Sequence, residues 1–183
     1  MEHRRLILMR HATAATGTGR DFDRPLTRRG LEEAQRVGER LRSQGPRPDR
    51  VITSSARRCV ETWQAVARGL GGAPDPGRAT GPIVEPLVEH DDRLYNASTR
   101  GLLAAIRAVD DAQTLLVLAH NPGISVLALE LGRAHPADEI ALRDGFAPAS
   151  TAIFGVAGAW CDLAAASTRL LRFDPAPREG DGD

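Results

Sequence analysis

The sequence predicts an α/β fold: a three-layer αβα sandwich with a mostly parallel central sheet and an antiparallel edge. Short apolar runs alternate along the chain with segments of helical periodicity, which is typical of βα units. The runs at 6–9 and 115–118 are wholly apolar, as expected for buried parallel strands, and the second lies within a strand predicted at 114–119. Later runs at 151–156 and 170–173 are typical of strands added in antiparallel fashion.

The first helix follows a long connection. A polar loop at 12–25 comes after the strand at 6–9, and Thr27 can cap a helix that runs to about residue 43. Helical spacing predicts its apolar face. That face comprises Leu31, Ala34, Val37 and Leu41.

The second βα unit is shorter. A strand at 51–52 leads into a cap cluster at 53–55 and a helix at 56–70. The stretch at 71–82 is rich in glycine and proline and should be a loop. We expect the strand at 83–88 to lie at the sheet edge, because the proline within it cannot donate to a ladder.

Two more helices are predicted around the strand at 114–119. Ser98 or Thr99 caps a helix that reaches about residue 109. Pro122 and Gly123 open a helix that reaches about residue 132.

Composition narrows the class of protein. We expect one domain, residues 1–173, and a disordered tail at 174–183. The 24 basic and 24 acidic residues balance, which argues against a nucleic-acid or membrane-surface binder. Cys59 and Cys161 match no metal-binding spacing. Since no apolar run suits a signal peptide or membrane span, we expect a soluble cytoplasmic protein.

Two predicted strands each end in a histidine. His11 follows the first strand directly after Arg10, and His120 follows the strand at 114–119. Open α/β sheets bind ligands at the carboxyl ends of their strands, so both imidazoles should reach one edge. A lone histidine there is more often an ordinary, partly buried residue. An arginine at the end of a buried strand, however, requires an anion, and the combination points to phosphate chemistry.

A third element contributes Arg58, in the first turn of the helix at 56–70. A helix N-terminus attracts anions, so a cation there is favourable only when an anion joins it. Arg57 in the same turn is better interpreted as a solvated surface residue.

A metal hydrolase that uses both histidines and His90 is a weaker alternative, because the histidines lack metal-binding spacing.

The order of these motifs resembles the histidine phosphatase superfamily, also called phosphoglycerate mutase-like, and its short bacterial phosphohistidine phosphatase branch. Residues 10–11 correspond to the Arg-His-Gly signature, and 23–30 to the segment that opens the first helix. Residues 54–62 resemble the Ser-Pro-x-x-Arg-Ala-x-x-Thr segment, which aligns Arg58 with the phosphate-binding arginine. Residues 119–123 match the second-histidine segment, particularly that of the short branch.

The resemblance implies a covalent phosphohistidine intermediate and four catalytic residues. His11 would attack phosphorus with one ring nitrogen, while a backbone carbonyl holds the proton on the other. Arg10 and Arg58 would bind the equatorial phosphoryl oxygens. His120 would donate to the bound phosphoryl group as an imidazolium. Because side chains supply the positive charge, no metal or cofactor is expected.

Two further residues are candidate substrate-binding groups, Arg24 and Asn121. Arg24 either reaches the phosphoryl group or forms a salt bridge with Asp21 or Asp23. Asn121 stands where acid-phosphatase relatives often carry an aspartate, which removes one proton donor. Ala12 replaces the glycine of the signature and is still small enough for close backbone approach.

Asp92 and Glu89 are the candidate proton donors, and Asp91 is a rival for the same role. For each of the three, the alternative is an ordinary carboxylate in a solvated loop.

Without a long insertion to form a lid, an open, shallow pocket is expected. Such a pocket suits a phosphorylated protein or a small phosphorylated metabolite. Imidazole leaves with less help from an acid than an alkoxide does, so protein phosphohistidine is the leading substrate. The alternatives are a small-molecule phosphomonoester phosphatase or mutase of the same superfamily, and a catalytically weak phosphoprotein-binding module.

Overall fold

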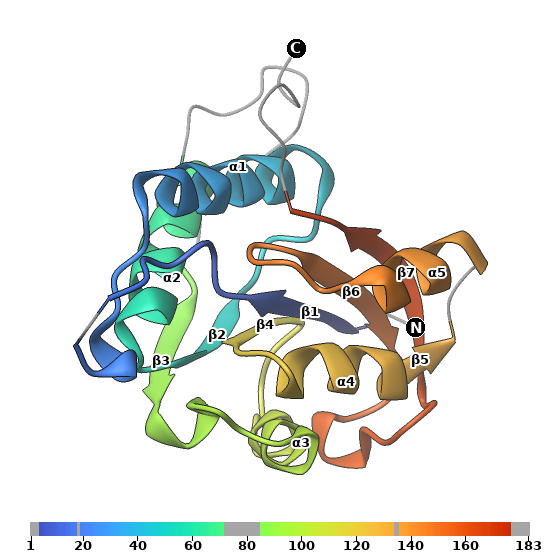
Figure 1. The fold of residues 1–183 in the computed structure, drawn as a ribbon. Coiled ribbons are helices and arrows are strands. Elements are labelled where there is room, and N and C mark those ends of the chain that lie inside the picture. Colours follow the sequence, from blue (N-terminus) through green and yellow to red (C-terminus); the bar gives the residue numbers. More distant parts are fainter. Residues whose placement is uncertain (1–3, 18, 72–84, 134–135, 177–183) are drawn as a thin grey trace.

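The computed structural model describes residues 4–17, 19–71, 85–133 and 136–176, which form an α/β sandwich (Figure 1). In this part of the chain a seven-stranded sheet has the order β3-β2-β4-β1-β6-β7-β5. Its parallel half comprises β1 (Arg4–Arg10), β2 (Arg50–Ser54), β3 (Leu87–Asp91) and β4 (Thr114–Ala119). Its other half comprises β5 (Gly132–Arg133), β6 (Thr151–Val156) and β7 (Thr168–Asp174). Because β6 runs antiparallel to β1 and β7, the predicted mostly parallel sheet with an antiparallel edge is confirmed.

Helices cover both faces of the sheet (Figure 1). One face carries α1 (Arg28–Gln44) and α2 (Arg57–Leu70), and the other carries α3 (Thr99–Arg107) and α4 (Gly123–Leu131). Strand β1 shows why both faces are covered, since its side chains alternate between two apolar cores. Leu6 and Leu8 pack in one core and Ile7 in the other, and all three are fully buried. The predicted three layers are therefore confirmed.

The first two helices cross at very short range. A Cβ atom at Gly38 of α1 would lie 2.1 Å from the carbonyl oxygen of Val66 in α2. Any larger residue at this position would push the helices apart. The predicted cap of α1 is confirmed, because the Thr27 side chain accepts a hydrogen bond from Gly30 N at 2.9 Å. Leu31, predicted on the apolar face, is instead exposed.

Several predicted boundaries are wrong. The strand predicted at 83–88 is β3, which begins at Leu87 and lies at the sheet edge as expected, although 83–84 fall outside the described residues. Residues 53–54 belong to β2, and Ala56 caps α2 without a side-chain hydrogen bond. The predicted loop at 71–82 lies almost wholly outside the described residues.

The carboxyl-terminal part holds more regular structure than predicted. Neither β5 nor α5 (Pro136–Asp144), which follows it, was predicted. Strand β7 extends beyond the strand predicted at 170–173, to Asp174, whose carboxylate forms salt bridges with Arg172 and Arg40. Of the helices in the described residues, none has both the length and the apolar character needed to cross a lipid bilayer.

Candidate active site

The carboxyl edge of the sheet brings the two predicted histidines together. Strands β1 and β4 are parallel neighbours with Arg10 opposite Ala119, so His11 and His120 follow them side by side. Their ring centroids lie 5.2 Å apart with an interplanar angle of 58°. The side chains are buried, with exposed fractions of 8% and 3%. The expected convergence of the two imidazoles is confirmed.

His11 is held in a single tautomer. Its Nδ1 atom lies 2.8 Å from the carbonyl oxygen of Ala12, and a carbonyl can only accept. Nδ1 therefore carries the proton, and Nε2 keeps a free lone pair. Burial, together with the charges of Arg58 and Arg10, lowers the pKa of His11 to about 4. At neutral pH the ring is uncharged, which is the form that a nucleophile requires.

Arg58 enters the site from the first turn of α2 and is almost fully buried. Its Nη1 donates to the carbonyl oxygen of Asp21 at 2.6 Å, and its Nη2 lies 3.1 Å from the Asp21 carboxylate. Nη2 also lies 3.1 Å from Nδ1 of His120. Arg57, one residue earlier, is exposed and pairs with Glu61. It is therefore a surface residue, as predicted.

His120 is neutral in this structure. Because a guanidinium can only donate, the contact with Arg58 makes Nδ1 the acceptor and leaves the proton on Nε2. Nε2 then donates to the hydroxyl of Ser54, 2.9 Å away. Burial, followed by the Arg58 charge, lowers the pKa of His120 to about 3. The neighbouring Cys59 is no rival nucleophile, since burial raises the pKa of its thiol to about 12.

Arg10 and Asn121 share one acceptor. Arg10 Nη1 donates to the carbonyl oxygen of Phe146 at 2.9 Å, and Asn121 Nδ2 donates to the same oxygen at 3.0 Å. The backbone N–H of Ala149 donates to the carbonyl oxygens of Arg10 and His11, which ties the segment after α5 to the end of β1. Among the described residues, the buried Oδ1 of Asn121 has no hydrogen-bond partner. That oxygen is available to a ligand with a donor group.

Arg24 forms the salt bridge that was one of its two predicted roles. Its Nη1 lies 3.1 Å from Oδ1 of Asp21, whereas Asp23 lies 3.6 Å from Arg20. The Arg24 charge also lowers the pKa of His11, so Arg24 lies close enough to influence that ring. Asp21 therefore binds both Arg24 and Arg58, a role that sequence reasoning missed.

Two carboxylates hold the loop that follows β1. Glu33 of α1 is buried and accepts from the backbone N–H and hydroxyl of Thr13 at 3.2 and 2.7 Å. Glu61 of α2 accepts from the backbone N–H of Leu26 at 2.7 Å. A Cβ atom at Gly30 would lie 2.1 Å from the Thr13 carbonyl oxygen, so this contact requires glycine. These bonds fix the backbone on both sides of the loop that carries Asp21.

The two candidate proton donors are not brought to the histidines. Glu89 lies in the middle of β3, opposite Ile52, and pairs at 3.1 Å with Arg50 at the start of β2. Its carboxylate is thus engaged with an arginine at the other end of the neighbouring strand, and its role as a proton donor stays a prediction. Asp92 follows the carboxyl end of β3, but its side chain is exposed and accepts a hydrogen bond from the Ser55 hydroxyl. The rival Asp91 binds Arg93 through both carboxylate oxygens.

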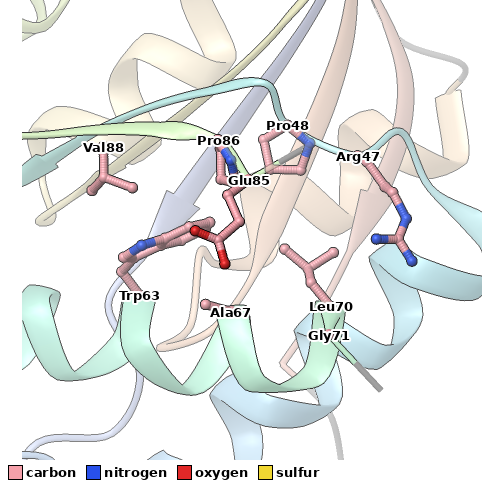
Figure 2. Close-up of a pocket in the computed structure, with 9 residues that line it drawn as sticks. All are labelled: Arg47, Pro48, Trp63, Ala67, Leu70, Gly71, Glu85, Pro86 and Val88. Atoms are coloured by element: carbon pink, nitrogen blue, oxygen red, sulfur yellow. The ribbon is translucent and has the colours of Figure 1, made fainter. Parts of the chain in front are cut away.

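Two other features lie away from the histidines. The described residues contain no group of three or more His, Cys, Asp or Glu side chains arranged to hold a metal, so His90 does not join the other two histidines. A cavity of about 280 Å³ lies between α2 and the start of β3 (Figure 2). It is mainly apolar, with Trp63 and Leu70 in its wall, and lies at the amino end of β2.

The geometry defines the class of protein first. A parallel sheet whose carboxyl edge holds two neutral imidazoles among guanidinium groups is a phosphoryl-binding α/β protein. The chain belongs to the histidine phosphatase superfamily. Residues 6–80 match the model of that superfamily's branch 1. The uncharacterized protein Rv1276c of Mycobacterium tuberculosis is 32% identical over 170 residues, which cover 90% of this chain and 98% of that protein.

Solved structures agree with this membership. A SixA protein of Nakamurella multipartita, described as a candidate phosphohistidine phosphatase, is 34% identical with a TM-score of 0.79. That match covers 95% of this chain and 96% of the other. A SixA protein of Agrobacterium tumefaciens, described in the same way, is 29% identical with a TM-score of 0.74, covering 95% and 98% of the two chains. The fold is thus shared over almost the whole length.

Proposed function

We propose that this protein is a phosphatase that hydrolyses protein phosphohistidine through a phosphohistidine intermediate on His11. One observation carries the proposal. The Ala12 carbonyl holds the proton on Nδ1 of His11, which leaves Nε2 as a neutral nucleophile whose pKa is lowered by burial and by the nearby Arg58 and Arg10 charges. The likeness to SixA proteins described as candidate phosphohistidine phosphatases supports the same substrate class.

The first chemical step transfers the phosphoryl group to His11. Nε2 attacks phosphorus, the phosphorus–nitrogen bond of the substrate breaks, and its electron pair stays with the departing imidazole. Arg10 and Arg58 bind the equatorial oxygens, over which charge spreads in the transition state. In the second step water attacks the phosphorylated His11 and releases inorganic phosphate. In this proposal the chemistry needs no metal.

The charge of the site suits a phosphoryl dianion. Arg10, Arg24 and Arg58 are cationic, Asp21 is the carboxylate bound to them, and both imidazoles are neutral. The excess is two positive charges, which matches a dianion. When the phosphoryl group binds, its negative charge raises the pKa of His120, so this ring gains a proton and donates to the substrate. Asn121 adds a polar group at the same edge.

The leaving group decides between phosphohistidine and phosphoesters. An alkoxide needs a proton donor, and in the described structure neither Asp92 nor Glu89 contacts His11 or His120. A protonated phosphoimidazole already carries the proton that it needs. The site therefore favours a protein phosphohistidine over a sugar phosphate, and we propose a cytoplasmic phosphoprotein as the partner.

A substrate panel tests the proposal. Wild type and His11→Ala are assayed on a phosphohistidine peptide, sugar phosphates and nucleotides, with a chelator present and absent. We expect the highest kcat/KM on the phosphohistidine peptide, no effect of the chelator, and no turnover by His11→Ala. His90→Ala, which changes an exposed histidine on β3, is the matched control. Turnover of a sugar phosphate alone would contradict the proposed substrate, and binding without turnover would indicate a phosphoprotein-binding module.

A further inference from the structure

Asp21 lies at the mouth of the site and binds groups from three different segments. Its Oδ2 accepts from Arg58 Nη2 at 3.1 Å and from the hydroxyl of Tyr95 at 2.7 Å. Its Oδ1 lies 3.1 Å from Arg24. Even so, half of the Asp21 side chain is exposed, so its carboxylate is accessible from solvent.

The Asp21 carboxylate keeps acceptor capacity for a ligand. A carboxylate offers about four acceptor positions, and the three contacts leave one on Oδ1. The hydrogen bond from Tyr95, followed by the Arg58 and Arg24 charges, lowers the pKa of Asp21. Asp21 is therefore an anion at neutral pH and cannot act as a proton donor.

An aromatic surface flanks this carboxylate. The ring of Tyr95 lies edge-on to Phe22, with centroids 5.1 Å apart, and edge-on to His120 at 5.5 Å. A flat, partly cationic ring fits beside such a surface. The mouth of the site thus combines one anion with aromatic rings, whereas the floor combines guanidinium groups with imidazoles.

We propose that Asp21 determines leaving-group specificity by accepting a hydrogen bond from the protonated ring nitrogen of a substrate phosphohistidine. This inference rests on the proposed function. The substrate ring carries phosphorus on one nitrogen and a proton on the other, and Asp21 stabilises that protonated form. When His11 attacks, the phosphorus–nitrogen bond breaks, the electron pair stays on the first nitrogen, and the ring leaves as neutral imidazole. No proton moves in this step, so the leaving group needs no acid from the protein.

Phosphoesters respond to Asp21 in the opposite way. Their leaving groups have no N–H to donate, and the carboxylate repels their dianionic phosphoryl group. Replacing Asp21 with asparagine removes this repulsion and releases Arg58 from an ion pair. The same substitution removes the charge that stabilises a protonated phosphohistidine. The two substrate classes should therefore change in opposite directions.

The test compares kcat/KM of wild type and Asp21→Asn on a phosphohistidine peptide and on p-nitrophenyl phosphate. A hydrogen bond between charged groups contributes enough that Asp21→Asn should lose about tenfold or more on the peptide. On p-nitrophenyl phosphate its kcat/KM should rise. Asp23→Asn is the matched control, because Asp23 is an exposed carboxylate in the same turn that pairs with Arg20. Asp21→Glu, which keeps the charge, should retain part of the preference for the peptide.

An equal loss on both substrates would overturn the inference, because Asp21 would then serve only to hold Arg58 in place. Unchanged activity of Asp21→Asn on both substrates would overturn it too. Either result would leave the proposed function standing. A wild-type enzyme that hydrolyses p-nitrophenyl phosphate but not the phosphohistidine peptide would overturn the proposed function together with the inference.

Discussion

The two ends of β2 differ in chemistry. At its carboxyl end, Ser54 accepts a hydrogen bond from His120, and both side chains are buried together with His11 and Arg58. At its amino end, an apolar cavity of about 280 Å³ lies beside Trp63 (Figure 2). The cavity therefore lies away from the histidines, whereas the end of β2 beside the histidines is held by hydrogen bonds and ion pairs. The candidate site is recognised by these bonded polar groups and does not coincide with this cavity.

The two ends also make opposite contributions to stability. Burial of an apolar side chain such as Trp63 stabilises the fold. His11 and His120 are buried in neutral form, whereas in the unfolded chain they take up protons below about pH 6.5. Below that pH their burial therefore lowers the free energy of unfolding. The comparison predicts that changes at the site abolish activity, whereas changes at the cavity alter stability.

The largest effect is expected for His11→Ala. Loss of a nucleophile should lower kcat by at least about a thousandfold, because no remaining group can form the covalent intermediate. Steady-state kinetics on the phosphohistidine peptide measure this, and circular dichroism checks that the variant is folded. Activity close to that of the wild type would show that His11 is not the nucleophile.

Arg58→Ala should have the next largest effect. Removing one donor aimed at transition-state charge costs about 3 kcal/mol, or about a hundredfold in kcat. Arg58→Lys should recover only part of this, since an ammonium cannot bind two oxygens as a planar fork does. The matched control is Arg57→Ala in the same helical turn, where the side chain is exposed and paired with Glu61. Similar losses of kcat in Arg57→Ala and Arg58→Ala would contradict the assignment of Arg58 as a phosphoryl-binding residue.

At the opposite end of β2, Trp63→Ala should separate stability from activity. Truncating a buried tryptophan lowers the free energy of unfolding by about 3 to 5 kcal/mol. The kcat of the folded variant should change by less than about threefold, because Trp63 lies beside the cavity rather than the imidazoles. Urea unfolding and kinetics on the same preparation test both statements. A loss of kcat as large as that of Arg58→Ala would mean that the two ends are coupled.

The smallest effect concerns pH. The folded-state pKa values of His11 and His120, about 4 and about 3, lie below the ordinary value of 6.5. As the pH falls below 6.5, the unfolded chain binds protons that the folded protein does not, so stability decreases down to about pH 3, where His120 is the last of the two to titrate in the folded protein. Above pH 6.5 these two groups contribute no pH dependence. We expect a lower urea midpoint at pH 5 than at pH 7.5; equal midpoints would indicate that the rings are not buried in neutral form.

Sequence reasoning predicted the parts of the site that follow regular elements. His11 and His120 could be placed because each ends a clearly apolar strand, and Arg58 because it opens a helix. The role of Thr62 is also clear in the structure: its hydroxyl accepts from Ala12 N at 3.1 Å and donates to the Arg58 carbonyl at 2.6 Å. Contacts of this kind follow from the position of α2 against β1.

The remaining parts depend on loops and on backbone atoms. Asp21 and Tyr95 are separated by 74 positions in the chain, and no local pattern indicates that they form a hydrogen bond. The acceptor shared by Arg10 and Asn121 is the carbonyl of Phe146, an atom that every residue possesses. Glu89 forms an ion pair with Arg50, a partner that proximity in sequence to the end of β3 does not indicate.

The most direct test of the central claim is to trap the phosphoryl group on the enzyme. Wild-type protein is mixed with phosphohistidine peptide, quenched within one turnover, and analysed by mass spectrometry under alkaline conditions that preserve phosphoramidates. The account predicts an acid-labile phosphoryl group on the peptide that contains His11, and none in His11→Ala. A wild-type enzyme that turns over the substrate while the label appears on another residue, or on none, would contradict it.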